Sequence, residues 1–206
     1  MIVIDVGNTN LVLGIYSKNK LTKVFRIKTE KNKKKFKSEF YNFLKSKKKI
    51  IQKLDTDLCV LSSVVPSLNL LIKNYFINLN FKFYIIDPKN IPLNVKIKYN
   101  LKQIGSDRVA NFVAIYNKKI SNCIIVDFGT ATTFDVIKNN EYFGGLIFPG
   151  INLSMSSLVE NADLISTTRI SKVKKIVAHN TKSSIMAGFY FGYLHTVNGI
   201  LNQIIK

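Results

Sequence analysis

The sequence has little cysteine. The 206-residue chain contains two, Cys59 and Cys123, and each lies inside an apolar run, where a thiol behaves as a small buried hydrophobic side chain. A disulfide framework of the kind that stabilises small secreted domains is therefore not expected. Because 47% of the residues are hydrophobic, we expect a packed core and reduced thiols in a cytoplasmic protein.

Long apolar segments are lacking as well. The first residues, Met-Ile-Val-Ile-Asp, contain no basic segment, and Asp5 interrupts the apolar stretch that a signal peptide needs. No run of about 20 apolar residues, the length that spans a bilayer, occurs in the sequence. We expect no membrane partner.

Acidic residues are few, 12 against 31 Lys and Arg, so the net charge is +19. Clustered basic residues can bind nucleic acid by displacing counterions from phosphates. The runs at 33–35 and 47–49, however, are pure lysine, and no recognition motif with interleaved aromatic residues accompanies them. We therefore expect solvated lysine faces, no nucleic-acid partner, and a basic field that favours the approach of anionic substrates.

The common nucleotide-binding loops are also absent. The sequence contains no Gly-Lys pair, which excludes a Walker A loop, and no Gly-x-Gly-x-x-Gly segment follows a predicted strand. Any phosphate site in this chain must be built from another kind of turn.

What the chain does contain is an internal repeat. Residues 2–9 read Ile-Val-Ile-Asp-Val-Gly-Asn-Thr, and residues 124–131 read Ile-Ile-Val-Asp-Phe-Gly-Thr-Ala. Each copy continues into a second β-rich run, at 11–16 and 132–137, and then into a polar turn. Both copies therefore predict a β-hairpin with Asp and Gly at its first bend.

The elements that follow each hairpin predict the fold class. The first copy continues with strands at 21–27, 58–65 and 83–86, and with helices near 34–46 and from Pro66. A helix near 106–116 precedes the second copy, which has strands at 122–127, 132–137 and 142–147 and helices near 151–160 and 181–205.

Three antiparallel strands followed by alternating helices and strands indicate an α/β protein with mixed sheets. The second copy lacks the closing strand, helix and strand of the first, so we expect its sheet to be incomplete. The predicted domains are residues 1–117 and 118–206.

The two Asp-Gly turns combine groups that bind phosphates. Residues 5–10 and 127–133 each supply a carboxylate, a glycine and small hydrogen-bonding residues. Backbone N–H groups and hydroxyls of such a turn can bind phosphate oxygens, while the carboxylate holds a hydrated cation. One such turn alone is ordinary turn chemistry, but a structural turn does not need these groups twice. The pair resembles the phosphate clamp of the actin-like ATPase superfamily, which implies two ribonuclease H-like domains with an ATP cleft between them.

A third segment, Gly105-Ser106-Asp107-Arg108, precedes an apolar helical pattern. One interpretation is a helix start with Ser106 as N-cap and Asp107 in the first turn, where the helix dipole favours negative charge. That interpretation does not account for Arg108 in a helix whose inner face is apolar. A carboxylate beside a guanidinium can act as a base toward a hydroxyl while the Arg binds an anionic group of the same substrate.

Five segments together resemble, in order, the motifs of the type III pantothenate kinase family: residues 5–9, 105–108, 127–133, 144–150 and 180–181. The resemblance implies the fold of the acetate and sugar kinase/Hsc70/actin superfamily. It also implies ATP-dependent phosphorylation of pantothenate, the first step of coenzyme A biosynthesis, with Mg²⁺, a monovalent cation (K⁺ or NH₄⁺) and a homodimer. We assign the glycines of 144–150 a structural role.

The resemblance further implies roles for individual residues. Asp107 becomes the catalytic base, and Asp127 becomes a ligand of the monovalent cation. The ATP contacts become Thr130 and the segment Asp5, Val6, Gly7, Asn8, Thr9, Asn10, Leu11 and Val12, with Asp5 on the Mg²⁺ side. The pantothenate contacts become Tyr99, Gly105, Ser106, Asp107, Arg108 and Thr181, and either Tyr99 or Thr181 reaches across the dimer interface.

Three function classes stay open. An active kinase is favoured because every charged motif residue is present. Members of the family continue past the position of Lys206 with a strand and a glycine-rich turn that helps to line the adenosine pocket. A catalytically weak or inactive regulatory relative, of the Bvg accessory factor type, is therefore the alternative. An actin-like ATPase would share the two turns but would not account for residues 105–108.

Overall fold

The computed structural model describes the whole chain except residues 19, 31, 55, 90, 92–94 and 166–168. The chain forms two compact units, residues 1–123 with 137–144 and residues 124–136 with 145–206. This division reflects the density of contacts. It does not test the predicted boundary at 117/118 between two duplicated domains, which stays a prediction.

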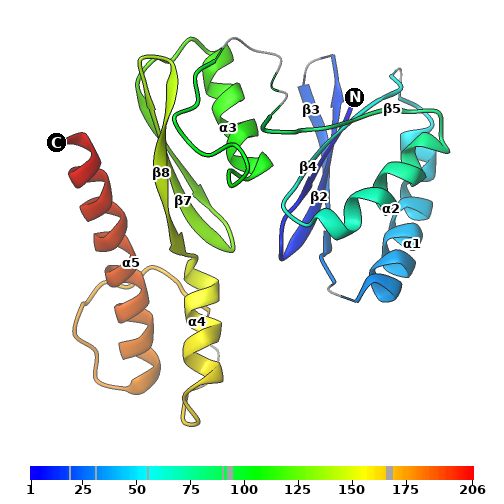
Figure 1. Ribbon diagram of the computed structural model, residues 1–206. Coiled ribbons are helices and arrows are strands. Elements are labelled where there is room, and N and C mark those ends of the chain that lie inside the picture. The colour runs from blue at the N-terminus through cyan, green and yellow to red at the C-terminus, as the bar shows by residue number, and fades with distance from the viewer. Residues whose placement is uncertain (19, 31, 55, 90, 92–94, 166–168) are drawn as a thin grey trace. The chain divides into compact units, whose positions relative to one another are not determined.

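The first unit contains a five-stranded sheet in the order β3-β2-β1-β4-β5 (Figure 1). Its strands are β1 (Ile2–Val6), β2 (Asn10–Ser17), β3 (Lys20–Lys28), β4 (Leu58–Ser63) and β5 (Lys82–Ile85). Strand β2 is antiparallel to β1 and β3, whereas β4 is parallel to β1 and β5. Helices α1 (Lys33–Ile51) and α2 (Pro66–Ile77) make the connections to β4 and β5 that parallel pairing requires.

One face of this sheet is buried against α1 and α2 (Figure 1). Alternate residues of β1, Ile2, Ile4 and Val6, are buried and point to this core. Helix α1 contributes Phe36, Phe40, Leu44 and Ile51. The alternation along β1 leaves Asp5 exposed on the other face.

Helix α1 is longer than its sequence pattern predicted. We expected a helix near residues 34–46, but the helix continues to Ile51, which is 4% exposed. Ile51 lies on the same face as Phe40 and Leu44, so burial of this one side chain extends the helix through the lysines. At the other end, Asn32 Oδ1 accepts the N–H groups of Lys34 and Lys35 as the N-cap.

The second sheet has three strands within the described residues, in the order β6-β7-β8. These are β6 (Cys123–Phe128), β7 (Ala131–Lys138) and β8 (Glu141–Pro149). Asn139 and Asn140, with φ of 53° and 61°, join β7 to β8 in the left-handed backbone that two-residue hairpins favour. Helix α3 (Ser106–Asn117) precedes this sheet, and α4 (Ile151–Glu160) and α5 (Thr181–Ile205) follow it.

The predicted fold class is confirmed. Both sheets begin with the hairpin that carries Asp and Gly, and the first has the mixed strand order of a ribonuclease H-like domain. In the described part of the chain, the second sheet contains only the three meander strands.

The two cysteines differ in burial. Cys59 on β4 is fully buried, and desolvation raises the pKa of its thiol to about 12, so this thiol stays protonated. Cys123 is only half-buried, which corrects the expectation that both are core residues. None of the helices in the described part of the chain is long and apolar enough to cross a membrane.

Candidate functional site

The first Asp-Gly turn joins β1 to β2. The N–H of Gly7 donates to the carbonyl of Asn10 at 3.0 Å and closes the turn. Asp5, Asn8, Thr9 and Asn10 are exposed. The turn therefore presents a carboxylate and three small polar side chains to solvent. Leu11 is fully buried, so its predicted contact with ATP is available only to its backbone.

Thr29, directly after β3, braces this turn. Its Oγ1 donates to the carbonyl of Gly7 at 2.8 Å, and its N–H donates to the carbonyl of Thr9 at 2.8 Å. Thr29 is itself buried. The sequence analysis did not select it, since it lies 22 residues from Gly7. The sequence feature that could have pointed to Thr29 was its position directly after β3, the strand that pairs with β2.

The second Asp-Gly turn joins β6 to β7. Here the N–H of Gly129 donates to the carbonyl of Ala131 at 3.0 Å, so the turn closes one residue earlier than the first. Asp127, Phe128, Gly129 and Thr130 are all exposed. This turn presents a carboxylate and a hydroxyl residue, as the repeat predicted.

Gly150 packs directly against the second turn. Its N–H donates to the carbonyl of Thr130 at 3.0 Å. A Cβ atom at this position would lie 2.2 Å from the carbonyl oxygen of Gly129 and 2.5 Å from that of Thr130. Because these are backbone atoms, only glycine fits. The structural role expected for the segment 144–150 thus has a specific physical cause at Gly150.

The segment 105–108 forms the start of α3. Gly105 is the N-cap and Ser106 the first helical residue, so the prediction of Ser106 as N-cap is wrong by one position. The hydroxyl of Ser106 donates to the carbonyl of Ser63 at 3.0 Å and accepts its N–H at 2.8 Å. Ser106 therefore fastens α3 to the end of β4. Asp107 lies in the first turn as predicted, and its Oδ1 accepts the N–H of Arg108 at 2.8 Å.

The parallel pairing of β1 with β4 brings two predicted site segments to one edge of the sheet. Val6 and Ser63 are partners in this register, and the N–H of Val64 donates to the carbonyl of Val6 at 3.0 Å. The first Asp-Gly turn follows Val6, and the start of α3 is bonded to Ser63. The carboxyl ends of parallel strands are the usual ligand-binding edge of α/β sheets.

Arg108 lies beside two aromatic rings. Its side chain is 4% exposed, and the guanidinium carbon lies 5.3 Å from the ring centre of Tyr99 and 5.9 Å from that of Tyr142. The structure thus brings together Tyr99 and Arg108, two of the predicted pantothenate contacts. Tyr142 was not selected from the sequence.

Thr130 and Thr181 both belong to the second unit. Thr181 is the exposed first residue of α5, whose N-cap Asn180 accepts the N–H of Ser183 at 2.9 Å. The assignments of Thr130 to ATP and of Thr181 to pantothenate stay predictions.

The described carboxylates fit a metal bound together with a nucleotide. No group of three His, Cys, Asp or Glu side chains within the described residues could hold a metal ion. Asp5 and Asp127 are each exposed at a turn. Mg²⁺ in kinases is typically bound by one or two carboxylates, water and substrate phosphates, and single exposed carboxylates suit that arrangement.

A mixed-sheet fold with two exposed Asp-Gly turns, and with a carboxylate in the first turn of α3 at the edge of the first sheet, is the arrangement expected of ATP-dependent small-molecule kinases. A family model described as type III pantothenate kinase matches residues 1–203. The chain belongs to the type III pantothenate kinase family.

Curated relatives agree over nearly the whole chain. The type III pantothenate kinase of Geotalea daltonii is 40% identical over 211 residues, which cover 99% of this chain and 80% of that protein. That of Pelagibacter ubique is 39% identical over 209 residues, covering 100% of this chain and 82% of that protein.

A solved structure supports the fold alone. A protein from Campylobacter jejuni, described as a Baf family transcriptional activator, superposes with a TM-score of 0.59 at 21% identity. The match covers 97% of this chain and 78% of that one.

The contact of Gly150 with the second turn predicts a sharp effect of a single methyl group. Gly150→Ala should displace the carbonyls of Gly129 and Thr130 and lower both stability and kinase activity. Overpacking of this kind costs about 1 to 3 kcal/mol, which urea denaturation measures. Gly199→Ala on α5 is the matched control, because a Cβ there would meet nothing within 4 Å. Equal stability and activity of the two variants would contradict the assigned role.

Proposed function

We propose that this chain is an active pantothenate kinase, which transfers the γ-phosphate of ATP to the primary hydroxyl of pantothenate and so begins coenzyme A biosynthesis. The observation that carries the proposal is the common edge of β1 and β4. The first Asp-Gly turn leaves β1 at that edge, and Asp107 is attached to β4 there through Ser106. The proposed phosphate-binding turn and the proposed base therefore both lie at one edge of a single sheet.

The two turns act on ATP by position and charge. Asp5, Thr9 and the backbone N–H groups of the first turn bind phosphate oxygens and the Mg²⁺ side of the nucleotide, and Thr130 adds a contact from the second turn. Phosphoryl transfer depends on positioning and charge neutralisation more than on covalent chemistry. When bound, Mg²⁺ and a monovalent cation near Asp127 supply further positive charge against the phosphates.

Asp107 acts as the general base. Its carboxylate accepts the proton of the pantothenate hydroxyl as that oxygen forms a bond to the γ-phosphorus, and the bond to the ADP oxygen breaks. The hydrogen bond from the N–H of Arg108 to Oδ1 orients the carboxylate. The buried guanidinium of Arg108 binds the carboxylate of pantothenate, with Tyr99 beside it.

We further propose a cytoplasmic homodimer. Helix α5 has 25 residues with one charged side chain, Lys182, and only Ala187 is buried. A largely apolar groove of about 330 Å³ runs along it, lined by Phe148, Ser154, Leu158, Ile185, Gly188, Phe189, Gly192, Tyr193 and Thr196. An apolar surface of this kind typically marks an interface, and a second copy of the same helix is the occupant that the family resemblance implies.

The assay that tests the function measures ADP release with and without pantothenate. A kinase releases ADP only when pantothenate is present, whereas an actin-like ATPase turns over without it. The Campylobacter jejuni protein of the same fold carries a regulatory description, so a regulatory relative is the competing possibility. A folded chain that releases no ADP at saturating ATP and pantothenate would favour that alternative.

Asp107→Asn is the companion variant in this assay. It keeps the size of the side chain but removes the base, so kcat should fall by roughly 10²- to 10⁴-fold. Nucleotide affinity and the free energy of unfolding should change little. Wild-type turnover of the variant would refute the assignment of Asp107.

Dependence on a monovalent cation tests the role of Asp127. Activity should be high in potassium or ammonium and poor in sodium alone, because a site of one carboxylate with carbonyl oxygens discriminates by the size of its cavity. Asp127→Asn should abolish that difference. Equal rates of the wild type in all three salts would remove the cation from the mechanism.

Light scattering tests the homodimer. The wild type should have twice the 23.4 kDa mass of one chain, and Gly192→Glu, which places a charge in the groove where a Cβ atom would meet nothing within 4 Å, should shift the mass toward the monomer. Leu70→Glu, at a 67% exposed position of α2, is the control and should leave the mass unchanged. A monomeric wild type at micromolar concentration would contradict the proposal.

A further inference from the structure

Tyr142 joins a group of three rings, two of which contact Arg108. It is the second residue of β8 and is fully buried. Its ring meets that of Phe112 at 5.6 Å and that of Tyr99 at 6.0 Å, both edge to face. Edge-to-face pairs of this kind add stability beyond simple burial, so the three rings hold one another in fixed orientations.

The backbone of Tyr142 also fixes the segment that carries Tyr99. The N–H of Tyr142 donates to the carbonyl of Lys96 at 2.9 Å, and its carbonyl accepts the N–H of Lys98 at 2.8 Å. These bonds form a parallel bridge between Ile97 and Tyr142. Tyr99 follows directly, so its position depends on Tyr142 through both the backbone and the ring.

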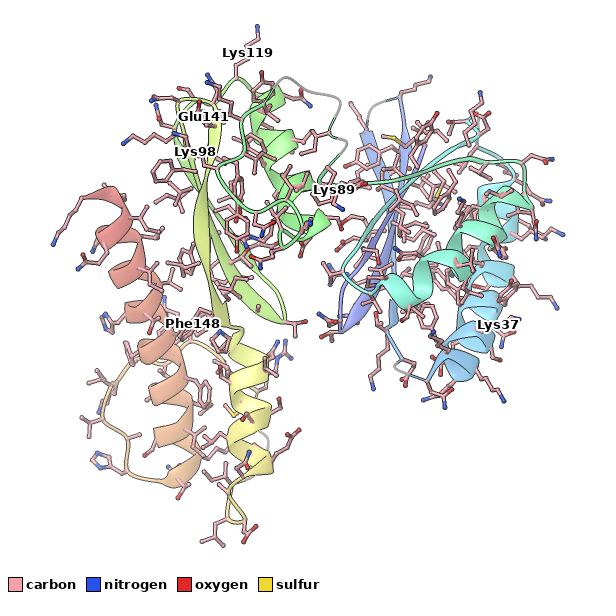
Figure 2. All side chains as sticks on the ribbon, viewed as in Figure 1. Lys37, Lys89, Lys98, Lys119, Glu141 and Phe148 are labelled. Atoms are coloured by element: carbon pink, nitrogen blue, oxygen red, sulfur yellow. The ribbon has the colours of Figure 1, made fainter. Side chains whose placement is uncertain are left out.

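Glu141 strengthens the same attachment from the surface. Its carboxylate pairs with Lys98 at 2.9 Å and with Lys96 at 3.5 Å, and Figure 2 shows Lys98 and Glu141 near each other at this end of β8. The hydrogen bond from Lys98 lowers the pKa of Glu141 below its ordinary value. The carboxylate therefore stays ionised and paired at neutral pH.

The rings of Tyr99 and Tyr142 both contact the guanidinium of Arg108. A ring face attracts a guanidinium within about 6 Å without cancelling its charge, and both Tyr99 and Tyr142 lie within that distance. Phe112, one helical turn after Arg108 on α3, packs edge to face against Tyr142. The arrangement orients the buried guanidinium.

We propose that Tyr142 is a positioning residue that sets Arg108 and Tyr99 to recognise the carboxylate of the substrate, and so determines selectivity for an acid over its neutral analogue. The inference rests on the proposed function of Arg108 and Tyr99 as pantothenate contacts. Tyr142 itself acts through them.

The test replaces the ring and compares two substrates. Tyr142→Leu should raise KM for pantothenate by about tenfold, which corresponds to the upper part of the range for a cation–π contact. Its kcat and its KM for ATP should change less than twofold. Pantothenol has the same hydroxyls but an alcohol in place of the carboxylate, and its KM should stay unchanged, so the preference for pantothenate falls by the same tenfold.

Two variants control for a merely structural effect. Tyr142→Phe retains the ring face and should restore the pantothenate KM to within about threefold of the wild type. Phe143→Leu makes a similar ring-to-Leu change at the next residue, where the ring is half-exposed and faces Lys98 and Lys138. It should leave the selectivity unchanged. Tyr142→Met fills more of the buried volume and takes the place of the Leu variant if that does not fold.

Equal losses of Tyr142→Leu toward pantothenate and pantothenol, or a loss confined to kcat, would overturn the proposal. Calorimetric binding of pantothenate without ATP separates it from the kinase proposal. A wild type that binds pantothenate without turnover would refute the kinase and still test Tyr142 by affinity. A wild type that binds no pantothenate would overturn both.

Discussion

The register between β1 and β4 is the constraint on which the rest of the first unit depends. Ile2, Ile4 and Val6 point into the core, and Val6 is aligned with Ser63. A slip by one residue would turn every side chain of β1 to the opposite face. It would bury the carboxylate of Asp5 and expose three apolar side chains, each of which stabilises the fold by roughly 1.5 to 3 kcal/mol when buried. Hydrophobic burial therefore also determines where the first Asp-Gly turn leaves the sheet and where α3 is bonded to it.

Local patterns were sufficient to predict the elements. The helix expected near 106–116 is Ser106–Asn117, and both Asp-Gly hairpins form where the repeat placed them. The errors have local causes: the lysine run concealed the last turn of α1, and Ser106 was assigned as a cap because serine is a favoured N-cap residue. Its hydroxyl instead bonds to Ser63, 43 residues away.

The supporting contacts of the site could not be predicted because they join residues that are far apart in the sequence. Thr29 bonds to Gly7 across 22 residues, and Tyr142 meets Arg108 across 34 positions of the sequence. No periodicity links such pairs, because only the tertiary fold brings them together. Gly150 was recognisable as a turn residue, but the requirement for glycine comes from carbonyls of Gly129 and Thr130.

The two turns show which part of the repeat is under physical constraint. Both present an acid and small polar residues outward, yet the inner supports differ. The hydroxyl and the N–H of Thr29 bond to the first turn. The N–H of Gly150 bonds to the second turn, and the lack of a side chain lets Gly150 approach that closely. The hydrogen bonds that close the two turns differ too: the N–H of Gly7 donates to the carbonyl of Asn10, whereas the N–H of Gly129 donates to the carbonyl of Ala131. Groups that face a ligand must keep their chemistry, whereas a supporting residue needs only to form hydrogen bonds with the backbone of the turn. A repeat in sequence therefore reveals the turns and conceals the residues that hold them.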